Sequence, residues 1–211
     1  MVLNNYRSTA DKVLEPLSRL FMRFHPNTLT LFAIISALIA GVMFTRPGSI
    51  YLLFAFVFVL LNSLFDAMDG KIARKKGIAS PYGDFTDHVL DRYADIFMLG
   101  GIAFGPYCST EIGLLGIVGV LLGSYMGTQA QAVGADRNYG GILGRADRLV
   151  LLLVVTLLQW ILLSYGIGRL GWNGWALYPL AWLMVWFAIA GNITAIQRGY
   201  RTWKWFRERE S

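Results

Sequence analysis

Residues 66–91 read DAMDGKIARKKGIASPYGDFTDHVLD, which is the most informative stretch of this chain. It sets carboxylates at helical spacing between two apolar segments: Asp66, Asp69, Asp87 and Asp91. A carboxylate near lipid is energetically costly, so we expect these four to lie together only where a cation binds among them. Oxygen donors without a cysteine or a ligand-like histidine suit Mg²⁺, Mn²⁺ or Ca²⁺ and not zinc.

The composition around this stretch indicates an integral membrane protein. Of 211 residues, 55% are hydrophobic and only 15% are charged, and the mean hydropathy is +0.50. These values exclude an ordinary soluble domain. We expect an all-α, six-transmembrane-helix bundle with spans near Thr28–Thr45, Ser49–Phe65, Asp87–Phe104, Glu111–Ala132, Ala146–Tyr165 and Trp175–Ile196.

Positive charge is distributed unevenly between the two sides of this bundle. The loops on one side hold only Arg46 and Arg169, and nearly all other Lys and Arg residues lie on the side of the Asp-rich stretch. The positive-inside rule then predicts a multi-pass protein of the cell membrane with both termini and the active site in the cytoplasm. The net charge of +6 reflects this topology and contact with membrane lipids, and we expect no nucleic-acid partner.

The amino-terminal segment has a helical repeat of its own. Apolar residues recur at helical spacing in Val13, Leu14, Leu17, Leu20, Phe21 and Phe24. We interpret residues 1–26 as a cytoplasmic amphipathic juxtamembrane helix and residues 27–211 as the six-span domain. A plain juxtamembrane linker is the alternative.

Small residues form a stripe on the fourth span. Gly116, Gly119, Gly123 and Gly127 share one helix face, and such stripes let helices approach closely. The stripe is equally consistent with packing inside the bundle and with dimerisation.

The spacing of the carboxylates predicts how the site is built. Asp66 and Asp69 share a face at the inner end of span two, and Asp87 and Asp91 share one at the start of span three. Two metal ions held about 3.5–4 Å apart between these pairs would serve displacement at phosphorus. Arg74 offers a fork to phosphate oxygens, and small residues leave room for a nucleotide diphosphate: Gly70, Ala73 and Gly83.

Taken together, these residues form the pattern D-x2-D-G-x2-A-R-x8-G-x3-D-x3-D, which resembles the signature of the CDP-alcohol phosphatidyltransferase family. Pro26-Asn27 with Thr30, at the start of span one, is similar to a second feature of that family. The resemblance implies a homodimeric enzyme in which an acceptor hydroxyl attacks a CDP-lipid and releases CMP.

The resemblance also implies a role for each residue of the motif. Asp66, Asp69, Asp87 and Asp91 would bind two Mg²⁺ or Mn²⁺ ions, and Asp91 would also act as the general base. The CDP group would be contacted by Thr30, Asp69, Gly70, Ala73, Arg74 and Gly83.

A second basic cluster suggests the acceptor. We interpret Arg137, Arg145, Arg148 and Arg198 as a pocket for a phosphate on the incoming alcohol. The chain resembles the inositol-phosphate-using branch of the family in Asp91-Arg92-Tyr93-Ala94-Asp95, but it departs from that branch after Ser124-Tyr125. The lipid is then CDP-diacylglycerol or CDP-archaeol, and glycerol phosphate is the nearest alternative acceptor.

Other classes of membrane protein also carry acidic residues. A membrane cation transporter places them near the bilayer midplane on broken helices, whereas these aspartates are expected at the ends of spans. A membrane prenyltransferase and a purely structural membrane protein are the remaining rivals. Release of CMP from a CDP-lipid distinguishes the enzyme from all three.

Overall fold

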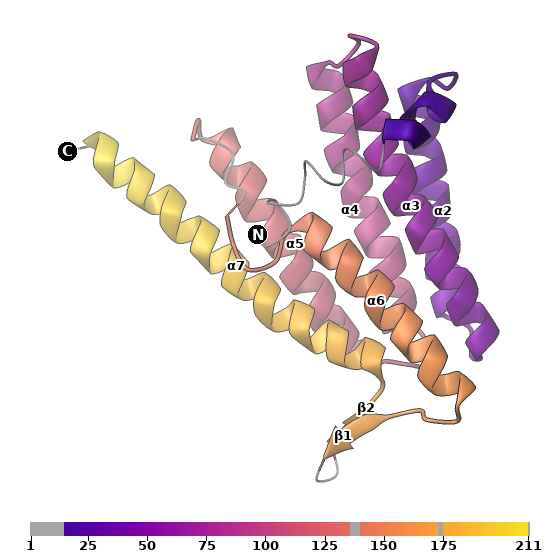
Figure 1. Ribbon diagram of the computed structural model, residues 1–211. Coiled ribbons are helices and arrows are strands. Elements are labelled where there is room, and N and C mark those ends of the chain that lie inside the picture. Colours follow the sequence, from indigo (N-terminus) through magenta and orange to yellow (C-terminus); the bar gives the residue numbers. More distant parts are fainter. Residues whose placement is uncertain (1–14, 136–139, 173–174, 211) are drawn as a thin grey trace.

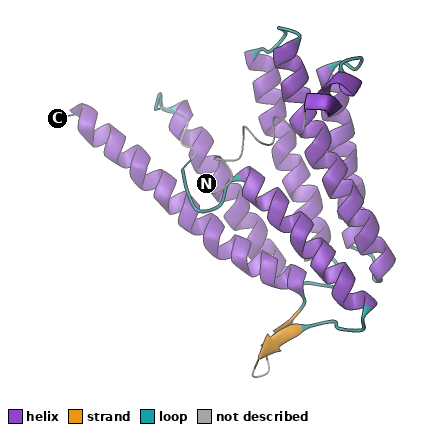
Figure 2. Cartoon of the chain, viewed as in Figure 1, coloured by secondary structure: helices purple, strands orange, loops and turns teal. Residues whose placement is uncertain are grey.

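The computed structural model describes residues 15–135, 140–172 and 175–210. These residues form a bundle of long helices with one antiparallel hairpin at the end away from the α3–α4 turn (Figures 1 and 2). The helices are α2 (Pro26–Phe44), α3 (Ser49–Lys75), α4 (Pro81–Ala103), α5 (Thr110–Ala132), α6 (Arg145–Ser164) and α7 (Pro179–Glu210). The hairpin strands are β1 (Leu170–Trp172) and β2 (Trp175–Leu177).

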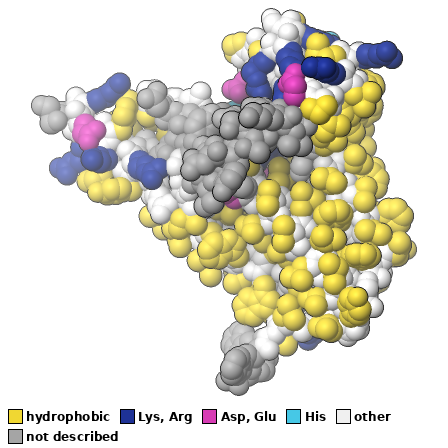
Figure 3. All heavy atoms as spheres, in the orientation of Figure 1, with side chains coloured by type: hydrophobic (Ala, Val, Ile, Leu, Met, Phe, Trp, Pro, Cys, Tyr) yellow, Lys and Arg dark blue, Asp and Glu magenta, His cyan; other side chains and the backbone are white. Residues whose placement is uncertain are grey.

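The outer surface of the bundle is that of a membrane protein. Within the described ranges, five helices are long and apolar enough to cross a membrane: α2, α3, α5, α6 and α7. In Figure 3, hydrophobic side chains cover most of the visible body of the bundle, while charged side chains gather at the α3–α4 turn and over the carboxyl-terminal part of α7. Helix α4 has 23 residues but carries Asp84, Asp87, Asp91, Arg92 and Asp95. The count of six spans therefore stays a prediction.

The helices around the Asp-rich stretch are longer than their apolar segments. Helix α3 continues past Phe65 to Lys75, and α4 begins at Pro81, before Asp87. The start of α4 is capped because the Ser80 hydroxyl accepts a hydrogen bond from the Gly83 N–H at 3.1 Å. Both aspartate pairs are thus held on regular helix.

The sixth expected span starts later and runs further than the apolar pattern indicated. Trp175 belongs to strand β2, and α7 extends from Pro179 to Glu210. The expectation that the helix begins at Trp175 was wrong because residues 175–177 pair with β1, in the register Leu170↔Leu177. The first three residues of the expected span, 175–177, therefore belong to the hairpin and not to α7.

The glycine stripe of α5 is used inside the bundle. A Cβ atom built on Gly119 would lie 2.5 Å from the Phe187 carbonyl oxygen, and one on Gly116 would lie 2.8 Å from the Met184 side chain. Both of these neighbours belong to α7, which can approach this closely only because side chains are missing. Packing between α5 and α7 therefore accounts for Gly116 and Gly119.

Residues 15–21 are helical, and residues 1–14 lie outside the described part of the chain. Leu17 and Phe21 pack against a buried cluster formed by Leu29 of α2 with Met68 and Ile72 of α3. The helix ends at Phe21, whereas the apolar repeat continues to Phe24, which is exposed. For residues 1–14 the amphipathic juxtamembrane helix stays a prediction. The domain boundary at residue 26 also stays a prediction.

Two groups of helices position the site. Helices α2, α3 and α4 pack together, α5 packs mainly against α7, and α6 contacts both α3 and α7. The α3–α4 turn places the Asp-rich faces next to α2, while the amino end of α6 approaches the same faces from the other side (Figure 1).

Candidate active site

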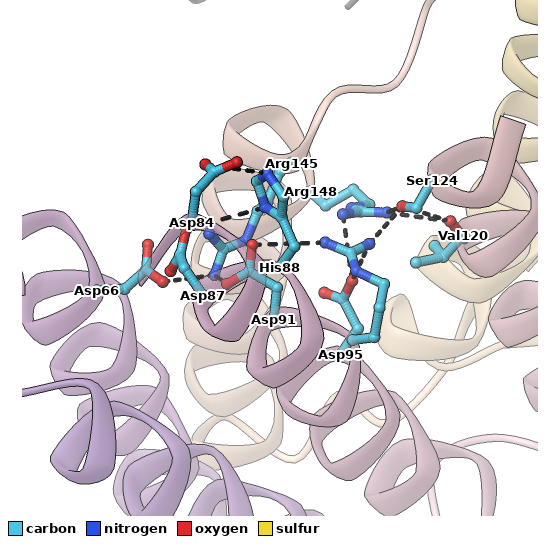
Figure 4. A network of polar contacts seen from close by, with 11 residues as sticks. Asp66, Asp84, Asp87, His88, Asp91, Asp95, Val120, Ser124, Arg145 and Arg148 are labelled. Atoms are coloured by element: carbon cyan, nitrogen blue, oxygen red, sulfur yellow. Dashed lines mark hydrogen bonds and ion pairs between the residues drawn. The ribbon is translucent and has the colours of Figure 1, made fainter. Parts of the chain in front are cut away.

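The α3–α4 turn brings the predicted metal-binding carboxylates to one place. Figure 4 shows Asp66 of α3 opposite Asp87 and Asp91 of α4. Asp69 lies one helical turn after Asp66 on α3 and lines the same cleft as Asp87. Asp69 and Asp91 are each only 5% exposed, so two of these carboxylates are almost withdrawn from solvent.

Asp69 is fixed by a contact with α2. The Thr30 hydroxyl donates a hydrogen bond to Asp69 Oδ2 at 2.7 Å. The same hydroxyl lies 3.1 Å from the Pro26 carbonyl oxygen, one turn earlier in α2. The two sequence features of the family resemblance, near residue 26 and near residue 69, thus meet in space.

Arg145 pairs with two of the predicted metal-binding carboxylates, Asp66 and Asp91. Its Nη2 atom lies 2.7 Å from Asp66 Oδ1 and also pairs with Asp91 Oδ1. Because Arg145 is the first residue of α6, this pairing connects α6 to α3 and α4. One guanidinium partly neutralises two of the four predicted metal ligands.

A cleft of about 710 Å³ opens beside these carboxylates, between α2, the end of α3 and the start of α4. Its walls contain all six residues that the family resemblance assigned to the CDP group: Thr30, Asp69, Gly70, Ala73, Arg74 and Gly83. Asp87 also lines it. The cleft therefore extends from the predicted metal ligands to the predicted nucleotide contacts.

The glycines of this cleft are not required by packing within the protein. A Cβ atom on Gly70 would lie 3.5 Å from an Arg74 nitrogen, and one on Gly83 would lie 3.5 Å from the Ser80 hydroxyl. Both are ordinary van der Waals distances. The missing side chains thus leave space in the cleft, in contrast to the glycines between α5 and α7.

A second ionic cluster lies deeper in the bundle. Asp95 Oδ2 is 2.9 Å from Arg92 Nη1 and 3.2 Å from Arg148 Nη2. Both arginines also donate to the Ser124 hydroxyl of α5. Arg92 further approaches Asp91, with 3.7 Å between Nη2 and Oδ2, so the cluster continues into the carboxylate site (Figure 4).

The predicted acceptor arginines have different surroundings. Arg145 reaches the carboxylates, and Arg148 is buried and also donates to the Val120 carbonyl oxygen at 3.2 Å. Arg198 is buried and donates to the carbonyl oxygens of Gly140 and Gly123. Arg137 lies outside the described residues. Among the described three, Arg145 is the one that extends to the predicted metal ligands.

Sequence reasoning found no ligand-like histidine, but the structure places one at the site. One donor atom each from Asp87, His88 and Asp91 can be chosen so that all three lie within 4.8 Å of one another. The signal in the sequence is the spacing of Asp84, Asp87, His88 and Asp91, which puts all four on one face of α4.

The described residues fit a divalent metal. Asp87, His88 and Asp91 each offer a ligand atom within 4.8 Å of the others, and Arg145 links Asp91 to Asp66 of α3. Hard divalent cations prefer such clusters of carboxylate oxygens.

Comparisons with known proteins agree with this geometry. A family model described as CDP-alcohol phosphatidyltransferase matches residues 23–194. The archaetidylinositol phosphate synthase of Pyrococcus horikoshii is 28% identical over 167 residues, which cover 76% of this chain and 87% of that protein. The phosphatidylinositol phosphate synthase of Cutibacterium acnes is 29% identical over 210 residues, which cover 93% and 95%.

Solved structures show the same fold. The crystal structure of Mycobacterium tuberculosis phosphatidylinositol phosphate synthase with CDP-DAG bound superposes with a TM-score of 0.71 at 23% identity, covering 91% of this chain and 94% of that one. The structure of the same enzyme in complex with manganese and citrate gives a TM-score of 0.70 at 22% identity, covering 89% and 88%.

Proposed function

Because the chain belongs to the CDP-alcohol phosphatidyltransferase family, we propose that it transfers a phosphatidyl or archaetidyl group from a CDP-lipid to a phosphorylated polyol and releases CMP. The observation that carries this proposal is the cleft. It unites Thr30 of α2, the Asp69–Arg74 segment of α3 and Gly83 of α4 beside the clustered carboxylates.

The cleft suits a nucleotide diphosphate in shape and charge. Its glycines leave the backbone open to a ligand, and Arg74, which is exposed on its wall, offers a planar fork for phosphate oxygens. Apolar residues on the α2 wall, including Leu31 and Ile34, continue the cleft towards the membrane-facing part of the bundle. A CDP-lipid has a polar nucleotide head and apolar lipid tails, so it matches both the polar wall and the apolar wall of the cleft.

Asp66, Asp69, Asp87 and Asp91 would hold Mg²⁺ or Mn²⁺, and Thr30 keeps Asp69 turned towards that group at 2.7 Å. Bound divalent metal supplies charge stabilisation for the pyrophosphate and its leaving group. Metal use is also consistent with the manganese complex of the M. tuberculosis enzyme.

Asp91 is assigned the proton transfer in this proposal. In the reaction, the acceptor oxygen forms a bond to the lipid-side phosphorus, the bond from that phosphorus to the CMP oxygen breaks, and Asp91 takes the hydroxyl proton. Arg145 and Arg92 approach Asp91 from α6 and α4 and hold its carboxylate in place. Burial of Asp91 excludes bulk water that would otherwise compete with the acceptor.

The acceptor is proposed to be inositol phosphate, with glycerol phosphate as the alternative. Relatives named for phosphatidylinositol phosphate and archaetidylinositol phosphate synthesis support the first. Arg145 lies within ion-pair distance of Asp91, so it is the arginine best placed to hold the phosphate of an acceptor whose hydroxyl meets that carboxylate. The lipid chains are those of CDP-diacylglycerol or CDP-archaeol.

Its setting in the membrane completes the proposal. The protein is a multi-pass membrane protein, and the distribution of Lys and Arg supports cytoplasmic termini and a cytoplasmic active site. We expect a homodimer, as the family resemblance implies.

The test is an acceptor screen with purified protein and either CDP-lipid, in which CMP release is measured. Inositol phosphate, glycerol phosphate, serine and free inositol are compared. CMP release with inositol phosphate supports the proposal, and release with glycerol phosphate alone selects the alternative. Absence of CMP release with every acceptor, together with metal-ion flux in proteoliposomes, would favour a cation transporter instead.

A further inference from the structure

His88 lies among the predicted metal ligands. Asp84, Asp87, His88 and Asp91 occupy successive positions on one face of α4, and Figure 4 shows the His88 ring among Asp84, Asp87 and Asp91. The ring is only partly exposed, with 25% of its side-chain surface accessible. It therefore lies between the exposed Asp84 and the buried Asp91.

The two ring nitrogens have different neighbours. Nε2 lies 3.3 Å from Asp84 Oδ1, and Nδ1 lies 4.0 Å from Asp87 Oδ2. Asp84 is well exposed at the amino end of α4, so it serves as an outer carboxylate that orients the ring. When Nε2–H donates to Asp84, the lone pair of Nδ1 faces the side of Asp87 and Asp91.

A carboxylate, a histidine and a metal in this order form a recurrent arrangement in metalloproteins. The outer carboxylate accepts from one ring nitrogen, which fixes the tautomer and makes the other nitrogen a better ligand. The positions of Asp84 and Asp87 on the two sides of His88 match this arrangement.

The distances allow a shared ion. The chosen donor atoms of Asp87, His88 and Asp91 lie within 4.8 Å of one another. Neighbouring ligands of an octahedral Mg²⁺ or Mn²⁺ ion are about 3.0 Å apart and opposite ligands about 4.2 Å apart, since each ligand bond is about 2.1 Å. Binding of one ion by all three donors therefore requires the side chains to draw closer together than they are without metal.

We propose that His88 Nδ1 is a ligand of the divalent metal site, held in orientation by Asp84, and that it shifts the preference of the site from Mg²⁺ towards Mn²⁺. Imidazole nitrogen suits transition metals better than Mg²⁺, which prefers oxygen. The inference rests on the metal site in the proposed function and adds to it a nitrogen donor and a metal preference.

The experiment uses full-length protein and Mn²⁺ alone. Loss of the free-ion signal in continuous-wave electron paramagnetic resonance reports Mn²⁺ binding, and pulsed measurements detect magnetic coupling of bound Mn²⁺ to nitrogen. We expect a directly bound nitrogen in the wild-type protein, and labelling with ¹⁵N-histidine should change its frequency. The labelled wild-type protein tests the assignment without any substitution.

Substitutions then identify the residue. His88→Asn should abolish the nitrogen coupling and weaken Mn²⁺ binding by about tenfold or more, with a smaller change for Mg²⁺ measured by competition. The matched control is His25→Asn at the other of the two histidines. His25 caps α2 by accepting from the Asn27 N–H, and asparagine also serves as a helix cap, so the nitrogen coupling should persist.

The outcomes separate this inference from the proposed function. Bound Mn²⁺ without histidine nitrogen coupling would overturn the role of His88 and leave the carboxylate site intact. Coupling that survives in His88→Asn would also overturn it. Failure of the wild-type protein to bind Mn²⁺ at all would overturn both.

Discussion

Gly70 and Gly83 differ from most glycines of the bundle in what a side chain would meet. A Cβ atom on either would contact only a flexible or small side-chain group at 3.5 Å, whereas one on Gly191 would lie 2.3 Å from the Gly119 backbone. The first two therefore leave room for a ligand, and the last leaves room for a neighbouring helix. Substitution by alanine separates the two uses.

Gly70→Ala and Gly83→Ala should leave the melting temperature nearly unchanged and raise KM for the CDP-lipid. A methyl group that overfills the nucleotide space costs about 1–3 kcal/mol, or roughly a 5- to 150-fold rise in KM. Gly191→Ala is the control and should lower the melting temperature because two backbones would be forced apart. An unchanged KM in both cleft variants would remove these glycines from the nucleotide site.

Asp91→Asn tests the general base. The substitution nearly preserves shape but removes the proton acceptor, so kcat should fall by roughly 10² to 10⁴-fold. KM for the CDP-lipid should change much less, because Arg74 and the other carboxylates of the site remain. Steady-state kinetics with saturating acceptor make the measurement, and turnover near the wild-type rate would assign the proton transfer to another residue.

Arg145→Ala tests the acceptor contact. Loss of one charge-assisted hydrogen bond to a phosphate costs roughly 1.5–3 kcal/mol, which corresponds to about a ten- to hundredfold rise in acceptor KM. Arg46→Ala, in the loop after α2 and away from the Asp-rich turn, is the control and should behave as wild type. An enzyme that prefers unphosphorylated inositol would contradict the phosphate pocket.

Which residues could be placed from sequence depended on how local their contacts are. The spacing of Asp66, Asp69, Asp87 and Asp91 fixes their helix faces, so their convergence across one turn was predictable. The burial of Arg148 was not, because its partners Asp95, Ser124 and Val120 come from α4 and α5. Contacts between distant helices leave no periodic signal in the chain.

At the scale of elements, the helix over residues 15–21 is held to α3 by charge as well as by apolar packing. Glu15 pairs with Lys75 and, at 3.2 Å, with Lys71. The Ser18 hydroxyl accepts from Lys75 at 2.8 Å. Lys71 and Lys75 flank Ile72, Ala73 and Arg74, so this helix abuts the segment of α3 that lines the cleft.

The Glu15 contact predicts a pH dependence. Hydrogen bonds from Lys75 and then Lys71 lower the pKa of Glu15 below its ordinary value of 4.5. A lowered pKa in the folded protein means that the pairing stabilises docking above pH 4.5 and is lost as the pH falls below that value. The protection factors of residues 15–21, which are exchange rates corrected for the intrinsic slowing of amide exchange in acid, should therefore fall in acid.

Glu15→Gln should remove this acid sensitivity and give faster exchange already at neutral pH. Glu208→Gln, which breaks the exposed pair with Lys204 near the end of α7, is the matched control and should leave residues 15–21 unchanged. Equal exchange rates in wild type and Glu15→Gln would show that Leu17 and Phe21 alone hold the helix.

At the scale of the whole molecule, the site lies where the two groups of helices meet. Carboxylates come from α3 and α4, while Arg145 comes from α6, which also contacts α7. The nucleotide cleft belongs to the first group alone. In the proposed function, α2, α3 and α4 would hold the donor lipid, and Arg145 of α6 would bring the acceptor to the same carboxylates.

Removal of metal tests whether the activity of the whole enzyme depends on a divalent cation. Protein treated with EDTA should show no CMP release, and Mg²⁺ or Mn²⁺ should restore it, because carboxylate oxygens select hard cations. Addition of Ca²⁺ tests the coordination geometry of the site, and addition of Zn²⁺ tests its preference for ligand type. Full activity after exhaustive chelation would contradict the metal site while leaving the fold unaffected.

Arg145, which pairs with Asp66 and Asp91, is also the first residue of α6. The amino end of a helix carries a partial positive charge of about half an elementary charge from its aligned peptide dipoles. That end of α6 therefore lies within the reach of one arginine side chain from the carboxylates. The backbone charge remains when the side chain is cut back, so Arg145→Ala removes the guanidinium but leaves the positive end of the helix in place.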